Sequence, residues 1–541
     1  MTDIEIPYKQ DRGRMYRFLE ILPGMLSWFM LFLPLILSLI NVTIASVFIL
    51  VYLLIFFVRS IGVNIRAFQG YNMMSKHRRM PWADMLAELE QGEILEQNAG
   101  RPKWHYENVA KAQAGDVVVR PEDVVHVIMI ATYNESREVL EPTIQSVIAS
   151  NFDMKKVILV LAYEERGGPE VERQANALMD QYSSTFMHAW AVKHPSDLPG
   201  EIRGKGGNIT YAGRILQENL EKEQIDPHRV MVTTLDADNR PDPNYLPALT
   251  YVYSLVPDPD RVSIQPISMY TNNIWDAPAP MRVIATGNTF FNIVLALRPH
   301  MLRNFSAHAQ SMASLIETDF WSVRTIVEDG HQFWRSYFRF EGEYRVIPLY
   351  VPIYQDAVLA DGYLKTFRAQ FIQLRRWTWG ASDIAYVITK GWLSKNKVPR
   401  WDLLTKTARL IEGHVTWAVG PIISLTAGFI PALINADSYT ANELPIIVSR
   451  IQTIALIGLS ASLFVCFKTL PPKPARYKRH RTLFMILQWV YLPVTTIVFN
   501  SFAALNSQTR LMFGKYLDKF DVTEKAVKTE AGETISRDTK E

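Results

Sequence analysis

Residues 230–238 read VMVTTLDAD, and they give the strongest local indication of the fold. Six uncharged residues, several of them β-branched, predict a buried strand. Asp236 and Asp238 follow at once, and side chains two apart on an extended chain point the same way. Two such carboxylates repel each other unless a cation or a set of donors lies between them. Mg²⁺ and similar hard cations take oxygen ligands and share them with substrate phosphates. A surface turn has the same letters, but the preceding strand favours a metal site for Mg²⁺ or Mn²⁺.

Strands and helices alternate on both sides of this stretch. Strands are predicted near 124–130, 156–162, 186–192 and 262–272, and helices near 137–150, 169–183 and 208–222. The segment 281–325 is predicted to be mainly helical, with its aromatic residues in the core. This order predicts an α/β domain with a mostly parallel sheet, in which ligands bind beyond the carboxyl ends of the strands. Polar residues at those predicted ends are Thr132, Tyr133, Glu135, Glu164, Glu165, Asp236 and Asp238.

A glycine-rich stretch at 203–208 reads RGKGGN. It lacks the G-x-G-x-x-G spacing and does not follow the first strand, so a Rossmann-type dinucleotide site is excluded. Glycine permits close approach of the backbone to a phosphate or base, and Lys205 adds a positive charge. The alternative is an ordinary turn before the helix at 208–222.

Two acidic residues, Glu328 and Asp329, stand in an aromatic neighbourhood that includes Phe333 and Trp334. Desolvation there raises the pKa of a carboxyl group toward neutrality, which suits a general base. The alternative is an acidic pair at the first turn of a helix.

Gln373, Arg376 and Trp377 follow at positions i, i+3 and i+4, so they share one helical face. A planar guanidinium suits a diphosphate, and tryptophan offers a flat apolar surface to a sugar ring. An amphipathic helix with interfacial aromatic anchors accounts for the same residues, and the two interpretations are compatible.

Apolar residues are concentrated at the two ends of the chain. Residues 22–58 contain no charged side chain, and a span needs about 20 apolar residues, so this run predicts two membrane helices with Asn41 near their turn. Further spans are predicted near 411–434 and 445–468. The region 482–514, which Pro493 interrupts, fits one span, a hairpin or a re-entrant pair. Lys and Arg before residue 22, after 58 and in 469–481, and their absence from 435–443, predict a cytoplasmic central domain.

The predicted organisation therefore has seven parts. They are a cytoplasmic N-terminus (1–21), two transmembrane helices (22–58), a cytoplasmic connection near the membrane (59–123), a catalytic domain (124–364), amphipathic interfacial helices (365–410), a C-terminal transmembrane region (411–514) and a charged, disordered tail (515–541). The formal net charge is only +3, and the middle of the chain contains no strongly basic part, so no nucleic-acid partner is expected. The single cysteine, Cys466, excludes an intrachain disulfide and a multi-cysteine zinc site.

The order of three motifs, D-x-D at 236–238, E-D at 328–329 and Q-x-x-R-W at 373–377, resembles membrane-embedded family 2 glycosyltransferases such as cellulose, hyaluronan and poly-N-acetylglucosamine synthases. The resemblance covers roughly 125–380 by motif and the flanking spans by layout. It implies a GT-A type nucleotide-sugar-binding domain flanked by transmembrane helices, in a protein of the bacterial cytoplasmic (inner) membrane. It also implies inverting transfer of a sugar from a nucleotide donor, UDP-linked, to a growing polysaccharide.

The same resemblance implies roles for individual residues. Asp238, with Asp236, is the metal-binding pair, Asp329 is the catalytic base beside Glu328, and Thr132, Tyr133 and Glu135 form the first nucleotide-contacting loop. The remaining residues expected to bind substrate are Glu164, Lys205, Gln373, Arg376 and Trp377. Three departures stand against the pattern: Val327 replaces the threonine of the T-E-D motif, Glu164 and Glu165 replace the usual aspartates, and residues 311–314 replace a glycine-rich acceptor loop.

Other functions remain open from the sequence. Transfer of one sugar to a lipid acceptor differs from polymer synthesis only in product length. A transporter or receptor with a nucleotide-sensing domain is a different class, for which the intramembrane charge of Arg450 is an argument. Membrane lipids are expected partners, and the sequence identifies no accessory subunit.

Overall fold

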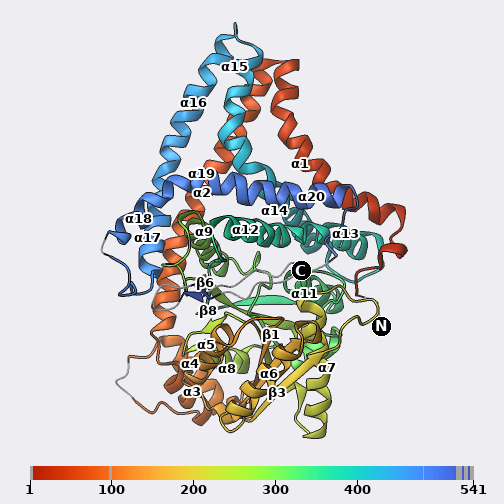
Figure 1. Cartoon of the computed structure of the whole chain (residues 1–541), viewed down its shortest axis with the longest axis vertical. Coiled ribbons are helices and arrows are strands. Elements are labelled where there is room, and N and C mark those ends of the chain that lie inside the picture. The colour runs from red at the N-terminus through yellow and green to blue at the C-terminus, as the bar shows by residue number, and fades with distance from the viewer. Residues whose placement is uncertain (1–3, 97–99, 479, 519–526, 529–533, 536–541) are drawn as a thin grey trace.

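The structure is a computed structural model that describes residues 4–96, 100–478, 480–518, 527–528 and 534–535. A sheet domain forms one end of the molecule and a group of long helices forms the other (Figure 1). The chain enters the helical end first, builds the sheet domain, and then returns to the helices.

The central sheet has eight strands in the order β3-β2-β1-β4-β7-β6-β8-β5. The first four are mutually parallel, and β8 is parallel to β6, whereas β7 runs antiparallel to β4 and β6, and β5 antiparallel to β8. The α/β class is as predicted, but the sheet is mixed. The bounds are β1 (Val125–Thr132), β2 (Val157–Glu164), β3 (His188–His194), β4 (Val230–Asp236), β5 (Arg240–Pro241), β6 (Val262–Tyr270), β7 (Ala309–Ser311) and β8 (Arg345–Gln355).

Helices cover both faces of the sheet because alternate strand residues are apolar on both sides. Val127 and Met129 pack with α7 (Lys205–Lys222) and α10 (Met312–Glu317). Ile128 and Ile130 pack on the opposite face with α5 (Arg137–Ile148), α6 (Pro169–Tyr182) and α8 (Tyr245–Leu255). Burial on both faces explains why these strands read as continuous apolar runs.

The segment 281–325 is not mainly helical. It contains α9 (Ala279–Ala296), a loop, the short strand β7 and α10, followed by an irregular stretch that ends where α11 (Glu328–Arg339) begins. Phe320 and Trp321 are buried as expected, but Phe291 is 55% exposed. Because β7 enters beside β4 from this loop, the sheet becomes mixed at its centre.

The connection 59–123 does not lie along the membrane end. Helix α2 (Val42–Arg78) continues far beyond the apolar run, and α3 (Trp82–Gln91) and α4 (Lys103–Gln113) lie at the far end of the sheet domain (Figure 1). Trp82, Met85 and Leu89 are buried in its core.

Within the described residues, five helical segments are long and apolar enough to cross a membrane: α1 (Arg14–Ile40), α2, Arg400–Ile434, Tyr439–Thr469 and Arg481–Met512. Asn41 ends α1 and caps α2, because its side-chain oxygen accepts hydrogen bonds from the backbone N–H groups of Thr43 and Ile44. The turn at Asn41 and the loop after 434 both lie at the end remote from the sheet domain (Figure 1). Within these segments the structure has α14 (Arg400–Thr426), α15 (Ile430–Ile434), α16 (Tyr439–Ala455), α17 (Leu459–Thr469), α18 (Arg481–Leu487), α19 (Leu492–Thr495) and α20 (Phe502–Met512).

The last of these segments, Arg481–Met512, runs across the others instead of beside them (Figure 1). Its final part is held at both sides: Gln508 accepts a hydrogen bond from Ser27 of α1 (2.6 Å) and donates one to the carbonyl of His414 in α14 (2.9 Å). Below it lies α12 (Tyr363–Thr378), to which Ser507 and Thr378 hydroxyls connect it at 2.9 Å. This segment therefore forms a crossbeam between the long helices and the sheet domain.

At the end of the chain, β9 (Val527–Lys528) and β10 (Thr534–Ile535) pair antiparallel. The predicted disorder of 515–541 otherwise concerns residues that lie mostly outside the described part of the chain.

Candidate active site

The carboxyl ends of the four parallel strands meet at one edge of the sheet. Register pairs Ala131 with Asp236, Thr132 with Tyr163, and Glu164 with His194. The polar residues predicted at strand ends therefore share this edge, as parallel topology requires.

Lys205 is the centre of the candidate site. Its Nζ lies 2.9 Å from Asp236 Oδ1 and 3.2 Å from Asp329 Oδ2, and its side chain is only 7% exposed. Burial alone would lower the pKa of Lys205, but the carboxylates of Asp236, Asp329 and Glu328 outweigh it and raise that pKa. The first turn of α7, which starts at Lys205 instead of the predicted 208, supplies this cation.

Glu328 and Asp329 open α11, at the position where a helix end favours acidic residues. Glu328 is buried, and burial together with the neighbouring Asp329 charge raises its pKa, against the opposing effects of Lys205 and Arg376. Its Oε2 has no hydrogen-bond partner among the described residues. Asp329 is more accessible, with 19% of its side chain exposed. The accessible carboxylate is thus Asp329, and Glu328 stands behind it.

Three further residues at this site were not predicted. Ser306 Oγ donates a hydrogen bond to Asp236 Oδ2 (2.7 Å), and His308 Nδ1 lies 3.8 Å from Asp329 Oδ1. Ser306 and His308 come from the loop before β7, and this loop was missed because 281–325 was predicted to be mainly helical. Tyr270 ends β6 with its ring 6.0 Å from that of Trp377. In the sequence, the position of Tyr270 near the end of a predicted strand could have marked it as a site residue.

The hydrogen bonds of His308 assign its protonation. The Phe305 carbonyl can only accept, at 2.8 Å from Nδ1, and Trp321 Nε1 can only donate, at 3.3 Å from Nε2. His308 is therefore a neutral imidazole that carries its proton on Nδ1, and burial lowers its pKa in agreement.

Asp238 lies beside this group on the loop after β4. It is buried, its Oδ2 accepts a hydrogen bond from the backbone N–H of Asp356 (3.2 Å), and Asn272 Nδ2 donates to its carbonyl (3.0 Å). Among the described residues there is no group of three or more His, Cys, Asp or Glu side chains that could hold a metal ion. Asp236 and Asp238 offer oxygen ligands of the kind that Mg²⁺ and Mn²⁺ accept, so they fit a cation whose other ligands come from a substrate phosphate.

Helix α12 brings Arg376 and Trp377 of the Q-x-x-R-W motif beside the site. Trp377 packs against Tyr270, and Arg376 lies close enough to Glu328 to stabilise its anion. Gln373 accepts a hydrogen bond from Gln370 within the same helix (3.1 Å). Since α12 also contacts the crossbeam, it connects the site to the helical end of the molecule.

The residues predicted to contact a nucleotide form a second group at the ends of β1 and β2. Glu135 Oε2 accepts hydrogen bonds from Thr132 Oγ1 and Tyr133 N, both at 2.8 Å, so its role in the structure is to hold this loop. Glu164 forms an ion pair with Arg166, whose guanidinium lies 5.6 Å from the centre of the Tyr133 ring.

Asn208 of α7 links this second group to Lys205. Its Nδ2 donates to the carbonyls of Thr132 (3.3 Å) and Ala162 (2.9 Å), and its buried Oδ1 has no partner in the described part of the chain.

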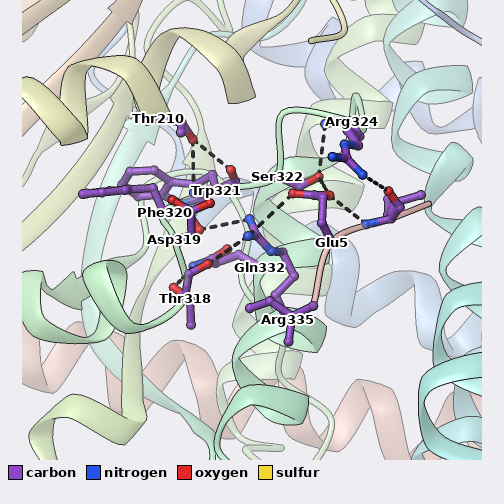
Figure 2. A network of polar contacts seen from close by, with 12 residues as sticks. Glu5, Thr210, Thr318, Asp319, Phe320, Trp321, Ser322, Arg324, Gln332 and Arg335 are labelled. Atoms are coloured by element: carbon purple, nitrogen blue, oxygen red, sulfur yellow. Dashed lines mark hydrogen bonds and ion pairs between the residues drawn. The ribbon is translucent and has the colours of Figure 1, made fainter. Parts of the chain in front are cut away.

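The loop between α10 and α11 sets the position of Glu328 and Asp329. Figure 2 shows Arg335 of α11 reaching back to the carbonyls of Thr318 (2.8 Å) and Phe320 (3.0 Å). Asp319 and Phe320 have positive φ angles of 49° and 57°, a conformation that costs energy in residues other than glycine. The buried arginine compensates by satisfying the carbonyls of this turn.

The same loop is fastened on two other sides. Thr210 of α7 accepts a hydrogen bond from Trp321 N (3.1 Å) and donates to its carbonyl (2.9 Å), and Glu5 accepts one from Ser322 Oγ at 2.5 Å (Figure 2). A Cβ atom at Gly206 would collide with the Ser322 carbonyl oxygen. Glycine at 206 thus lets α7 and this loop approach closely enough for Lys205 to contact Asp329.

No protein-family profile and no curated protein matches the sequence. Among solved structures, the chain is similar to the mannosyltransferase PcManGT from Pyrobaculum calidifontis in complex with GDP-Man and Mn²⁺ (TM-score 0.39, 12% identity, 84% of this chain and 100% of that one). It is also similar to S. aureus TarS 1–349 in complex with UDP-GlcNAc (TM-score 0.36, 10% identity, 76% of this chain and 97% of that one). With TM-scores below 0.5, these likenesses do not assign an activity to this chain.

Proposed function

We propose that the protein is a membrane-embedded, inverting glycosyltransferase of the GT-A type and family 2. It transfers a sugar from a nucleotide-sugar donor, UDP-linked, to a hydroxyl of a growing polysaccharide. The observation that carries the proposal is the contact of Lys205 with both Asp236 and Asp329. This contact brings together Asp236, at the end of β4, and Asp329, at the start of α11, in one partly buried site. In the proposal, Asp236 belongs to the part that binds the sugar donor and Asp329 to the part that binds the acceptor.

The donor side has the groups that a nucleoside diphosphate needs. Lys205 and the backbone N–H groups at the start of α7 favour a bound anion. The loop of Thr132, Tyr133 and Glu135, with Glu164, lies along the same sheet edge and would face the nucleoside. Asp238 and Asp236 would hold Mg²⁺ or Mn²⁺, which when bound offsets the negative charge of the diphosphate.

The acceptor side supplies a base. Asp329 takes the proton of the acceptor hydroxyl while the hydroxyl oxygen attacks the anomeric carbon of the donor sugar. The bond between that carbon and the diphosphate oxygen breaks, and the electron pair leaves with the diphosphate. Arg376 is the side chain that would stabilise this leaving group, and Trp377 with Tyr270 would support the sugar ring. Attack from the side opposite the leaving group inverts the configuration.

A second candidate is the transfer of one sugar to a lipid acceptor. One of the five apolar helices forms a crossbeam instead of a span beside the others, which favours a small helical bundle over a wide polymer channel. Both candidates use the same carboxylates and differ in the length of the product.

The test uses the full chain purified in detergent with a panel of UDP- and GDP-linked sugars, with and without Mg²⁺ or Mn²⁺. Release of free nucleotide and product size are measured together. Asp329→Asn should abolish transfer while nucleotide binding survives, because it removes the base and keeps the side-chain shape. Asp180→Asn is the matched control, since this exposed aspartate lies near the end of α6, outside the site and outside the loop that positions α11.

Metal-dependent release with a long product would support polymer synthesis. A single-sugar lipid product would favour the second candidate. Unchanged turnover in Asp329→Asn would refute the assignment of the base, and no release with any donor, even with membrane lipids added, would contradict glycosyl transfer.

A further inference from the structure

Five arginines converge where the long helices meet the sheet domain. The arginine cluster consists of Arg59, Arg66, Arg298, Arg303 and Arg409. Arg59 and Arg66 lie on α2, Arg409 lies on α14, and Arg298 and Arg303 lie in the loop after α9. Arg298 is within electrostatic reach of Arg59, Arg66 and Arg409, and Arg303 is within reach of Arg409.

Packing between the helices explains this convergence. Arg59 forms an ion pair with Glu412 and so joins α2 to α14. A Cβ atom at Gly70 of α2 would lie 2.7 Å from the carbonyl oxygen of Ile293, so α2 and α9 touch backbone to backbone one turn beyond Arg66. Arg303 stacks on the Phe333 ring of α11 at 4.1 Å.

The charges of the cluster are poorly balanced. In the described part of the chain, none of Arg66, Arg298, Arg303 and Arg409 forms an ion pair with a carboxylate, and Arg298 Nε is buried without a partner. Arg66 instead donates to the Gly62 carbonyl of its own helix (3.0 Å). Burial, followed by the like charge of Arg409, lowers the pKa of Arg303 to about 10 even though Asp402 opposes the shift. An anion bound among these guanidinium groups would relieve their mutual repulsion.

The cluster lies at the level where lipid headgroups are expected. The apolar run of α2 ends at Val58, directly before Arg59, and Arg409 of α14 stands just before the predicted span 411–434, which has Glu412 and His414 near its start. Exposed aromatic side chains stand on two of the helices involved: Phe291 on α9 is 55% exposed, and Trp401, about two turns before Arg409 on α14, is 76% exposed. The anion that reaches such a place is the headgroup of a membrane lipid.

The preference of Lys and Arg for the cytoplasmic ends of spanning helices accounts for only part of the cluster. It covers Arg59, Arg66 and Arg409, which belong to apolar helices. Arg298 and Arg303 belong to the sheet domain and are half-buried, so they serve no purpose in orienting a span. We propose that the arginine cluster binds the phosphate headgroup of an anionic membrane lipid at the membrane-facing side of the catalytic domain.

This site has a direct connection to the candidate active site. Arg303 precedes by three residues Ser306, which hydrogen-bonds Asp236. The Phe333 ring under Arg303 belongs to the same helix as Asp329, one turn further along. A bound lipid phosphate would therefore be held close to the acceptor side, although lipid binding does not depend on sugar transfer.

The test measures binding, with no sugar donor present, so its failure is distinct from a failure of the proposed activity. The full chain in neutral detergent is titrated by calorimetry with dioctanoyl phosphatidate, dioctanoyl phosphatidylcholine and inorganic phosphate. Phosphatidate should bind saturably at one site and more tightly than the other two. The double variant Arg298→Gln/Arg409→Gln should bind it about tenfold more weakly or worse, since each charged hydrogen bond lost costs that order of affinity.

Arg173→Gln with Arg214→Gln is the matched control, because it removes two exposed arginines from α6 and α7, which cover the sheet and do not belong to the cluster. Arg409→Gln alone, at an exposed position, preserves the test if Arg298→Gln does not fold. Undiminished phosphatidate binding in the variants would overturn the proposal. So would inorganic phosphate that binds as tightly as phosphatidate, which indicates a site for free phosphate, or equal binding of phosphatidylcholine, which indicates adsorption to the apolar surface.

Discussion

Replacement of Lys205 by methionine would remove the cation of the candidate site and leave the apolar stem of the side chain nearly intact. Asp236 and Asp329 would each lose a partner within 3.2 Å, and Glu328 would lose the charge that opposes its high pKa. We therefore expect both the stability and the activity of the protein to fall.

The size of the stability loss follows from burial. Removal of one partner from a buried ion pair costs about 3–5 kcal/mol, because the other charge stays in a poorly solvated place. The side chain of Asp236 is 34% exposed and that of Asp329 is 19% exposed, so solvent screens part of this cost. The expected loss at pH 8 is the lower end, about 3 kcal/mol.

The loss should depend on pH with a definite sign. Because the pKa of Lys205 is raised in the folded state, Lys205 is protonated in both the folded and the unfolded chain between pH 5.5 and 8, and its own titration adds no pH dependence there. In the variant, the carboxyl group of Glu328, whose pKa burial and Asp329 already raise, loses the opposing charge of Lys205, and its protonation relieves part of the repulsion. The deficit relative to the wild-type protein should therefore shrink as the pH falls from 8 to 5.5.

The assay is thermal unfolding of the detergent-purified chain at the two pH values, with nucleotide binding measured in parallel. Lys222→Met is the matched control, since this exposed lysine stands at the other end of α7. A wild-type melting temperature in Lys205→Met, or a deficit that is as large at pH 5.5 as at pH 8, would refute the neutralising role of Lys205.

Three further predictions concern the same site. Burial and the charge of Asp329 raise the pKa of Glu328, so above the ordinary carboxyl pKa of about 4.3 the folded state keeps a proton that the unfolded state has lost. The free energy of unfolding should therefore fall as the pH rises. Glu328→Gln should flatten this pH dependence in unfolding experiments, and an unchanged slope would contradict the burial argument. Gly206→Ala should destabilise the fold by about 1–3 kcal/mol and reduce transfer, because its Cβ collides with the Ser322 carbonyl; a wild-type melting temperature and rate would show that the loop yields freely. Asp238→Asn should weaken nucleotide binding about tenfold in the presence of Mn²⁺ and little in its absence; wild-type affinity that is the same with and without metal would exclude the metal role.

The order of strands and helices in the sheet domain could be predicted from local patterns. Uncharged runs such as 157–162 and 230–235 become strands because both of their faces are covered, and Asn41 ends a helix because its side chain caps the next one. Topology then brings Thr132, Glu164 and Asp236 to one edge, since parallel strands present their carboxyl ends together.

Patterns failed where the outcome depends on long-range packing. The region 281–325 is rich in apolar residues, but β7 within it forms only because β4 and β6 offer it hydrogen-bond partners. The region 482–514 has the composition of a span, but its direction is decided by contacts such as that of Gln508 with Ser27, 481 residues away along the chain.

Most elements and the polar residues at their ends therefore follow from local properties of the chain, because strand and helix periodicity and the preferences of caps are local. Which of these ends meet depends on the packing of the folded molecule. Lys205 contacts Asp329 across 124 residues because Gly206 admits the Ser322 loop and Arg335 holds that loop in place. Such contacts follow from packing among distant segments, for which no local pattern in the chain provides a signal.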